Sequence, residues 1–252
     1  MTSDVTDRLA IAEIAGRDSV AAAVAAVRER GFARLLPSIA LTGTETGDAE
    51  APLRAIDTLR SLLGDTSEVL DPVYLHEPAL WSAMNARFAS VLAERFGMGS
   101  PCLACHLYMH LLRVPVAWEA GNAPVIAGER DTHDGRIKLS QTTQSIDAAI
   151  RVLAYGDIEL VQPVRHASGE EVAELVGGTW DEGGGQLGCL LSGNYAAPDG
   201  TVAYDHAAYA RYLAEFFEPV GRAVIDAWRT EAAGGPAPDW RAIVTDVLEE
   251  RA

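Results

Sequence analysis

Three cysteines carry the clearest chemical signal in this sequence. Cys102 and Cys105 form a C-x-x-C pair, Cys189 lies 84 residues beyond Cys105, and the sequence has no further cysteine. Thiolates are soft ligands that suit iron–sulfur clusters and zinc, and an odd number of cysteines argues against a disulfide framework. The residues alone leave several uses open: a cluster, a Cys₃His zinc site completed by His106 or His110, a metal-free persulfide relay, or burial as small apolar side chains.

A second set of residues, near the N-terminus, has the pattern of a phosphate-binding turn. The apolar segment 9–14 predicts a buried strand, and the string A-G-R-D-S at 15–19 leads from it into an Ala/Val-rich helix. Small residues let backbone amides approach a phosphate, and a helix N-terminus adds unpaired N–H groups and the positive end of the helix dipole. We expect Ser19 to donate a hydrogen bond to phosphate, Arg17 to offset its charge, and Asp18 to orient the loop or help to hold Mg²⁺. The same string also fits an ordinary helix N-cap without a ligand.

Charged side chains gather over residues 129–141, directly after another predicted strand. We expect Arg136 and Lys138 to neutralise a pyrophosphate leaving group, and Glu129 or Asp131 to hold Mg²⁺ or a substrate amine. A solvated surface loop would show the same charges.

The helix that follows the cysteine pair has a polar face. His106, His110 and Arg113 are spaced i, i+4 and i+7, which places them on one side of a helix. We expect this face to line the substrate pocket, although either histidine taken alone is more commonly structural.

The elements that must position these residues alternate between strands and helices. Strands are expected over 9–14, 35–41, 69–75, 124–128 and 158–161, and helices over 18–30, 51–63, 78–96, 106–114, 168–176, 204–228 and 240–251. This alternation predicts an α/β fold in which a parallel sheet has helices on both faces, followed by a C-terminal helical extension. Ligands of such sheets lie beyond the carboxyl ends of the strands, so the loops at Gly16, Thr42 and Gly128 should share one edge. We divide the chain into a catalytic domain over 1–200 and the extension over 201–252.

The N-terminal turn resembles the S-G-G-x-D-S signature of the PP-loop ATP pyrophosphatases, the adenine nucleotide α-hydrolase-like superfamily. Gly16, Asp18 and Ser19 agree with that signature, whereas Ile14 and Ala15 stand in place of its serine and first glycine.

The order of features along the chain is also similar to that superfamily, from Leu9 to Tyr195. A second strand (35–41) follows the turn, then the cysteine pair, a glycine-containing strand end (126–129), and a strand leading to Pro163 before a further helix. The resemblance implies a Rossmann-like fold of the HUP type that binds ATP with Mg²⁺. It implies nucleotide contacts from Ala15, Gly16, Arg17, Asp18, Ser19, Thr42 and Gly128, and catalytic roles for Asp18, Arg136 and Lys138.

The thiols are similar to those of the sulfur-transfer branch of the superfamily. Several of its members hold a [4Fe-4S] cluster on a C-x-x-C pair and one distant cysteine, which leaves one iron open. The resemblance therefore implies that Cys102, Cys105 and Cys189 are cluster ligands, with zinc as the alternative metal. It implies an AMP- and pyrophosphate-forming sulfurtransferase that adenylates a carbonyl oxygen and replaces that oxygen with sulfur. The donor would be sulfide or a sulfur-carrier protein.

Composition narrows the choice of substrate. The chain has 20 basic and 36 acidic residues and a formal net charge of −16, whereas nucleic-acid binders need a basic surface. We therefore expect a small heterocyclic substrate, for which a purine nucleobase is one candidate, and no nucleic acid; members of the superfamily that thiolate tRNA also carry added modules that we do not find here. The alternatives are a tRNA-thiolating enzyme, an amidating or ligating PP-loop enzyme with a structural zinc, and a nucleotide sensor without catalysis.

Length and hydropathy set the remaining bounds. The 252 residues suffice for one large domain with a buried core, and no apolar stretch is long enough for a membrane span. The first residues lack a basic region followed by an apolar core, so we expect no export signal and a cytoplasmic location in which thiols stay reduced. The sequence leaves a homodimer open.

Overall fold

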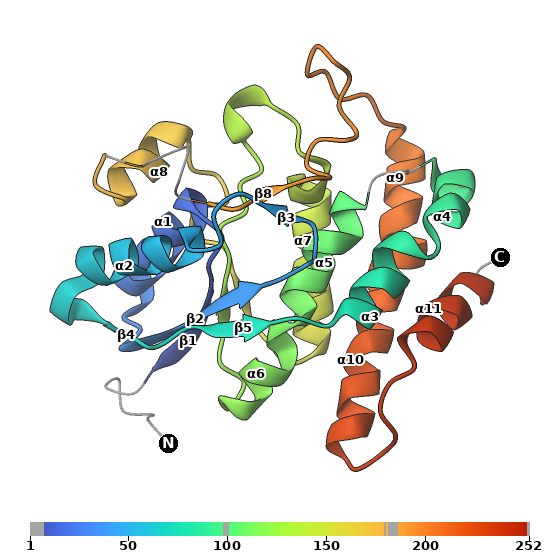
Figure 1. The fold of residues 1–252 in the computed structure, drawn as a ribbon, viewed down its shortest axis with the longest axis horizontal. Coiled ribbons are helices and arrows are strands. Elements are labelled where there is room, and N and C mark those ends of the chain that lie inside the picture. The colour runs from blue at the N-terminus through green and yellow to red at the C-terminus, as the bar shows by residue number, and fades with distance from the viewer. Residues whose placement is uncertain (1–7, 98–100, 179, 181–185, 251–252) are drawn as a thin grey trace.

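A parallel sheet forms the centre of the structure, which is a computed structural model that describes residues 8–97, 101–178, 180 and 186–250. The strands of this sheet are β1 (Leu9–Glu13), β2 (Arg34–Ala40), β4 (Glu68–Val69), β5 (Val73–Leu75), β6 (Val125–Ile126) and β7 (Leu160–Val161). Their order is β4-β2-β1-β6-β7, β5 also pairs with β2, and every pairing is parallel (Figure 1). The α/β class expected from the sequence is confirmed.

A proline explains why the single strand expected over 69–75 is divided into β4 and β5. The carbonyl of Leu35 in β2 accepts a hydrogen bond from the amide of Leu70, so every second residue of β2 faces this neighbour. Pro37 is the next residue in that row, and it has no N–H to donate. The neighbouring strand is therefore interrupted beside Pro37, and it pairs with β2 again from β5 onward.

Helices cover both faces of the sheet (Figure 1). One face carries α1 (Arg17–Arg30), α2 (Ala51–Leu63) and α8 (Gly169–Leu175); the other carries α5 (Cys102–Leu111), α6 (Arg113–Glu119), α7 (Thr143–Tyr155) and α10 (Glu218–Ala232). Strand β1 shows the alternation that this requires, because Ala10 and Ala12 pack in the cluster around α1 and Ile11 packs in the cluster around α5. The alanine- and valine-rich α1 is buried from Ser19 to Val27, which lets it lie close to the sheet.

Three helical segments differ from the expectation. The long helix expected over 78–96 is broken into α3 (Pro78–Trp81), a π-helical turn (Ser82–Ala86) and α4 (Ala89–Phe96). The helix expected over 106–114 starts at the C-x-x-C pair, as expected, but it ends at Leu111 and is followed by the separate helix α6. Helix α7 was not expected, although Thr142 caps it by accepting a hydrogen bond from the amide of Ser145.

The remaining elements are short or C-terminal. Strands β3 (Glu45–Thr46) and β8 (Gly188–Cys189) form a separate antiparallel pair, and 3₁₀ turns occur at Gly64–Thr66, His133–Gly135 and Leu139–Gln141. The C-terminal helices are α9 (His206–Tyr212), a π-helical segment (Leu213–Phe217), α10 and α11 (Trp240–Glu249).

The C-terminal helices complete the core on the α5 side. Tyr209, Phe216 and Phe217 are buried in the same hydrophobic cluster as Leu103 and Leu107 of α5. The expected C-terminal helices are present, and a domain boundary at residue 200 stays a prediction. Within the described part of the chain, no helix has the length and apolar character that a membrane span requires.

Candidate functional site

Two adjoining cavities lie at the carboxyl edge of the sheet. The larger, of about 400 Å³, is lined by the turn between β1 and α1 and by the segment after β6, and we call it the loop cavity. The smaller, of about 180 Å³, is lined by all three cysteines, and we call it the thiol cavity. The residues common to both linings are Ile14, Ala15, Ala40, His106 and Met109. These five residues form a wall shared by the two cavities. The turn at 15–19 lies on one side of this shared wall and the three cysteines lie on the other.

The turn at 15–19 is held by its own serine. The Ser19 hydroxyl accepts hydrogen bonds from the amides of Ala15 and Gly16, each at 3.0 Å, and donates one to the Gly16 carbonyl at 2.7 Å. The structure therefore gives Ser19 partners inside the loop, where the sequence analysis expected a bond to phosphate. The first-turn amides of α1, which have no acceptor within the helix, remain the donors that this turn offers.

Two glycines of the loop cavity, Gly128 and Gly16, have no room for a side chain. Gly128 lies against backbone atoms and Gly16 lies against the side chain of Gln186. A Cβ atom on Gly128 would lie 2.6 Å from the carbonyl carbon of Asp18 and from the amide nitrogen of Ser19, so the end of β6 touches the turn backbone directly. Gly16 has an extended backbone (φ 177°), and a Cβ there would lie 2.5 Å from Oε1 and 2.7 Å from Cβ of Gln186, so residue 186 would have to shift. Gly128 is therefore the position at which only glycine fits.

The cationic end of the loop cavity is organised around Asp18. Its carboxylate lies 2.9 Å from Nε of Arg130, which is 4% exposed, and 3.2 Å from Nε of Arg17. Arg136 and Lys138, expected at this site, line the same end. Burial lowers the pKa of Lys138, and Arg130 and Arg136 lower it further, although Asp18 acts in the opposite direction.

Arg130 was not among the site residues expected from the sequence. Its position two residues after Gly128, in the charged segment, was the signal that could have identified it. With its two arginine partners, Asp18 has the position of a residue that orients the loop.

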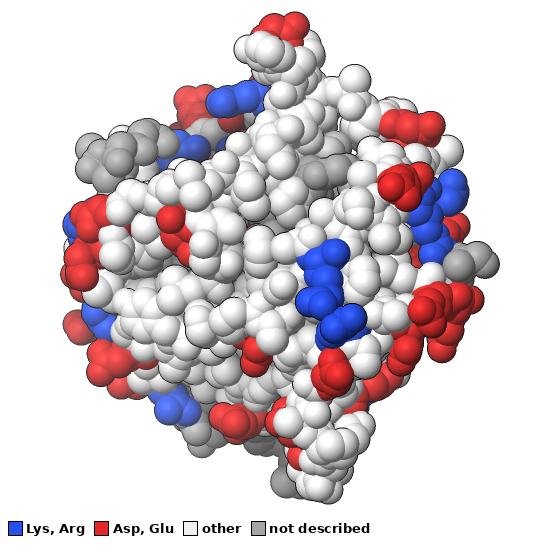
Figure 2. All heavy atoms as spheres, turned by 45° about the vertical axis from the view of Figure 1, so that its right-hand side comes forward, with Lys and Arg blue, Asp and Glu red and all other residues white. Residues whose placement is uncertain are grey.

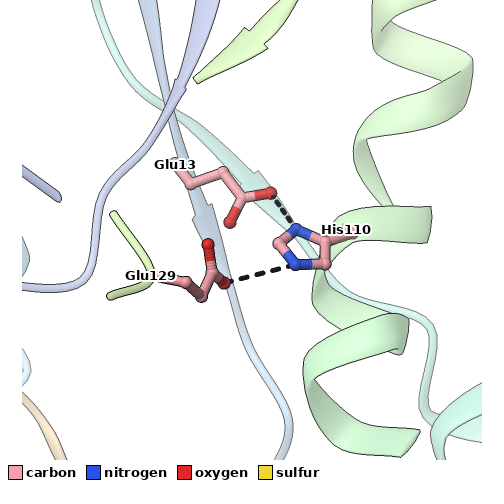
Figure 3. Close-up of side chains that lie close together, drawn as sticks. All are labelled: Glu13, His110 and Glu129. Carbon is pink, nitrogen blue, oxygen red and sulfur yellow. Dashed lines mark hydrogen bonds and ion pairs between the residues drawn. The ribbon is translucent and has the colours of Figure 1, made fainter. Parts of the chain in front are cut away.

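A buried group of charges lies where β1 and β6 end (Figure 3), and Glu13, Glu129 and Arg113 of this group line the loop cavity. The carboxylates of Glu13, from the end of β1, and Glu129, from the end of β6, point toward the two ring nitrogens of His110, at 2.7 Å from Nδ1 and 3.2 Å from Nε2. Arg113 adds a second cation 3.4 Å from Glu13 and donates to the Ser38 hydroxyl at 2.9 Å. The polar helix face expected from the sequence therefore packs on two strand ends.

The electrostatics of this group keep His110 positively charged and Glu129 negatively charged. Burial alone would lower the pKa of His110, but the carboxylates of Glu13 and Glu129 outweigh it and raise that pKa to about 10. Burial alone would raise the pKa of Glu129, but His110 and His106 hold it well below its usual range. Because the protonated ring supplies the positive charge between the two carboxylates, a metal ion would have to displace it.

Asp131, which the sequence analysis paired with Glu129 as a candidate ligand, has other partners. Its carboxylate lies 3.2 Å from Nε of Arg165 and 3.0 Å from Nδ1 of His166. It is absent from the lining of the loop cavity, whereas Glu129 is part of it.

The thiol cavity gathers the cysteines from three segments. The antiparallel pair β3–β8 places Cys189 opposite Glu45, and the Cys189 sulfur lies 3.2 Å from the Thr44 hydroxyl. Trp81 Nε1 donates to the Cys105 sulfur at 3.3 Å. Thr42, expected to contact nucleotide, lines this cavity and is bonded to Glu45, so the structure places it on the thiol side of the wall.

The thiols are close enough to influence one another. Burial raises the pKa of Cys105 to about 12, the N–H of Trp81 opposes this, and the neighbouring Cys189 and Cys102 raise it further. Among the described residues, the set of three ligand atoms that all lie within 4.8 Å of one another is Glu13, His110 and Glu129, and the three sulfurs do not meet that limit.

Comparison with known proteins identifies one relative. The chain is 34% identical over 215 residues to the uncharacterized protein MJ0009 of Methanocaldococcus jannaschii, a match that covers 84% of this chain and 77% of that protein. The chain belongs to the same family as MJ0009. No protein-family model matches the chain.

Two solved structures are similar in overall fold. One is a 4-thiouridine synthetase in complex with RNA and with bound ATP (TM-score 0.48, 12% identity), and the match covers 97% of this chain and 54% of that chain. The other is the U34-tRNA thiolase NcsA from Methanococcus maripaludis with its [4Fe-4S] cluster (TM-score 0.39, 14% identity, 98% of this chain and 74% of that chain). This chain spans about half the length of the 4-thiouridine synthetase. Both TM-scores are too low for these likenesses to bear on the function of this chain.

Proposed function

We propose that this protein is an ATP-dependent sulfurtransferase that adenylates a carbonyl oxygen of its substrate and replaces that oxygen with sulfur. The observation that carries the proposal is the shared wall between the loop cavity and the thiol cavity. An activated carbonyl formed at the loop cavity would lie next to the thiol cavity, which all three cysteines line.

The loop cavity has the groups that a nucleoside triphosphate requires. The residues of the first turn of α1 line it, Gly128 lets the end of β6 approach the turn, and Arg136 and Lys138 supply positive charge for a leaving pyrophosphate. In this proposal Asp18 holds Arg130 in place, and Mg²⁺ enters with the phosphates.

The spacing of the thiols favours an iron–sulfur cluster over a single zinc ion. With Zn–S bonds of about 2.3 Å, one zinc ion would draw its sulfurs to within about 4 Å of one another, which is closer than these thiols lie. Cys102, Cys105 and Cys189 would hold the cluster, and a cluster with three protein ligands supplies one iron that can bind sulfide.

The reaction then proceeds in two balanced steps. The substrate carbonyl oxygen attacks the α-phosphorus, an O–P bond forms, and pyrophosphate leaves toward Arg136 and Lys138. Hydrosulfide then attacks the carbonyl carbon, a C–S bond forms, the C–O bond breaks so that AMP leaves, and the S–H proton passes to solvent to give C=S. The residues of this chain bind the phosphates and orient the carbonyl at the shared wall.

A small heterocyclic amide, for which a purine nucleobase is one candidate, is the substrate class that we propose. The formal charge is −16. On the face shown in Figure 2, basic side chains occur in separate groups and much of the surface is uncharged. A continuous basic track, which tRNA binding would favour, is not seen on that face. A tRNA is the alternative substrate, and the assay below separates the two.

The first experiment is anaerobic purification with iron, sulfide and zinc analysis. We expect about four irons per chain and a brown protein, and loss of most iron in each of Cys102→Ala, Cys105→Ala and Cys189→Ala. Ser90→Ala, at an exposed position of α4, is the matched control and should keep its iron. Protein that contains zinc and no iron would favour an amidating or ligating enzyme with a structural zinc.

The second experiment measures the reaction itself. Reconstituted protein is given ATP, sulfide and either purine nucleobases or bulk tRNA, and pyrophosphate, AMP and thiolated product are measured. We expect pyrophosphate release and sulfur incorporation into the small heterocycle. Sulfur incorporation into tRNA alone would reassign the substrate, and nucleotide binding without pyrophosphate release would indicate a sensor.

A further inference from the structure

The cationic end of the loop cavity contains a histidine that the proposed reaction does not use. His133 is 4% exposed and lines the cavity beside Arg130, Arg136 and Lys138. Its Nε2 atom is buried without a hydrogen-bond partner. Buried polar atoms are nearly always paired, so an unpaired nitrogen at a cavity wall indicates a partner that a ligand supplies.

The backbone that carries His133 is also unusual. Three successive residues have left-handed conformations, with φ of 36° at His133, 53° at Asp134 and 87° at Gly135. Such conformations are uncommon outside glycine and cluster at ligand sites. The turn is fixed at the start of α8, because Asp134 Oδ1 accepts a hydrogen bond from the amide of Gly169 at 2.9 Å.

The surroundings of His133 keep its ring neutral in the ligand-free protein. Burial first, and then the positive charges of Lys138 and Arg130, lower the pKa of His133 to about 4, while Gln141 and Asp18 act in the opposite direction. A hydrogen bond with Gln141 favours the charged ring, and Nε2 is left without a partner. The other charged side chains lining this end are Arg17, Asp134 and Arg136.

We propose that this end of the cavity is a subsite for the outer phosphates of a phosphate chain, and that His133 completes it by taking up one proton as the chain binds. A phosphate chain neutralises Lys138 and Arg130 and reverses the local charge, so the proton becomes favourable on Nε2. The protonated ring then donates to a phosphate oxygen, which satisfies the unpaired nitrogen. The proton comes from solvent, and no bond to phosphorus is made or broken. The inference rests on the proposed nucleotide reaction.

Proton uptake can be measured directly by titration calorimetry. Inorganic pyrophosphate is titrated into the full chain at pH 7 in two buffers of different ionisation enthalpy, and the difference gives the protons taken up per pyrophosphate bound. The variants are His133→Asn, which tolerates the left-handed backbone, and His133→Gln. His206→Asn, at an exposed position of α9, is the control. We expect wild type and control to take up close to one proton more than either His133 variant.

The pH dependence of affinity gives the second measure. Between pH 8 and pH 6, the affinity of wild type for pyrophosphate should rise by up to about tenfold per pH unit more than that of the variants. If thermal melts show that the variants fold poorly, the protonation of His133 is followed in wild type by the NMR signals of the ring nitrogens. One histidine should change from neutral to protonated when pyrophosphate is added.

The outcomes separate this subsite from the proposed function. Equal proton uptake by wild type and both folded variants, or unchanged histidine signals on saturation, would overturn the role of His133 while leaving ATP binding intact. Wild type that binds neither pyrophosphate nor ATP would overturn the nucleotide reaction and the subsite together.

Discussion

At the scale of residues, the most consequential group is the buried imidazole between two carboxylates. His110 ties the end of β1, through Glu13, to the end of β6, through Glu129. Charges removed from water are tolerated only when they are paired and hydrogen-bonded, and here each carboxylate faces one ring nitrogen. Glu13, His110 and Glu129 therefore form an ion-paired group beside the loop cavity, and the ion pairs require the proton on His110.

This group predicts how stability changes with pH. The pKa of His110 is raised to about 10, so as pH rises the unfolded chain loses its proton before the folded chain does. The stabilisation is complete below about pH 6.5 and is lost progressively up to pH 10. Glu129, whose pKa is lowered, gives the opposite trend in acid. Urea unfolding should show a free energy of unfolding that falls from pH 7 to pH 9, by at most about 1.4 kcal/mol per pH unit from this group.

The matched variants isolate the contribution of His110. His110→Asn should flatten the fall in stability between pH 7 and pH 9, because no proton is left to lose, whereas His76→Asn, at an exposed position, should keep the wild-type slope. Identical slopes in all three proteins would mean that His110 is not charged in the folded chain.

Asp18 gives the second prediction at the residue scale. Its carboxylate lies 2.9 Å from Nε of the buried Arg130, so Asp18→Ala should leave that cation poorly held at the phosphate end. We expect ATP-dependent pyrophosphate release to fall on the order of 100-fold, with Asp18→Asn retaining part of the activity and both variants folded. Asp48→Ala, in an exposed ion pair with Arg54, is the control. Full turnover by Asp18→Ala would show that Asp18 and the turn at 15–19 are not needed for pyrophosphate release.

At the scale of elements, the contact between the end of β6 and the turn before α1 determines the shape of the loop cavity. A Cβ on Gly128 would lie 2.6 Å from the backbone of the turn itself, whereas one on Gly16 would lie 2.5 Å from Oε1 and 2.7 Å from Cβ of one residue, Gln186. Gly128→Ala should therefore weaken ATP binding at least tenfold and destabilise the fold by about 1–3 kcal/mol, and Gly16→Ala should do less of both. Equilibrium dialysis with ATP and urea unfolding of the two variants would test this. Greater damage from Gly16→Ala would contradict the packing argument.

The same scale shows what the sequence could and could not predict. Strand and turn patterns placed Gly16 and Gly128 at one edge of a parallel sheet, and cysteine spacing identified the thiols, because both signals are local. The pairing of β3 with β8, which positions Cys189, joins segments far apart in the chain and leaves little trace in two-residue strands. Thr42 was assigned to the nucleotide for the same reason, since its side of the wall depends on that pairing. The left-handed turn at His133 follows from contacts with α8 that no propensity encodes.

At the scale of the whole molecule, the C-terminal helices and α5 share one core. Tyr209, Phe216 and Phe217 pack with Leu103 and Leu107, so the helix that begins with Cys102 and Cys105 is supported from residues far beyond the sheet. On the loop side of the shared wall α1 is buried from Ser19 to Val27, whereas on the thiol side Cys189 is exposed. In the proposed two-step reaction the activated carbonyl must meet sulfur before it meets water.

Net charge gives the last prediction, which concerns the substrate. A chain with 20 basic and 36 acidic residues repels a polyanion at long range, and tRNA binding requires several phosphates to be neutralised at once. We expect bulk tRNA to bind no more tightly than about 100 μM at physiological salt, the weak end of nonspecific binding, while ATP still binds at the loop cavity through local cations. A gel-shift titration at two salt concentrations, with ATP binding by equilibrium dialysis as the internal control, measures both on one preparation. Tight tRNA binding that weakens steeply with salt would show that a local basic surface overrides the net charge, and would make tRNA the substrate of the same two cavities.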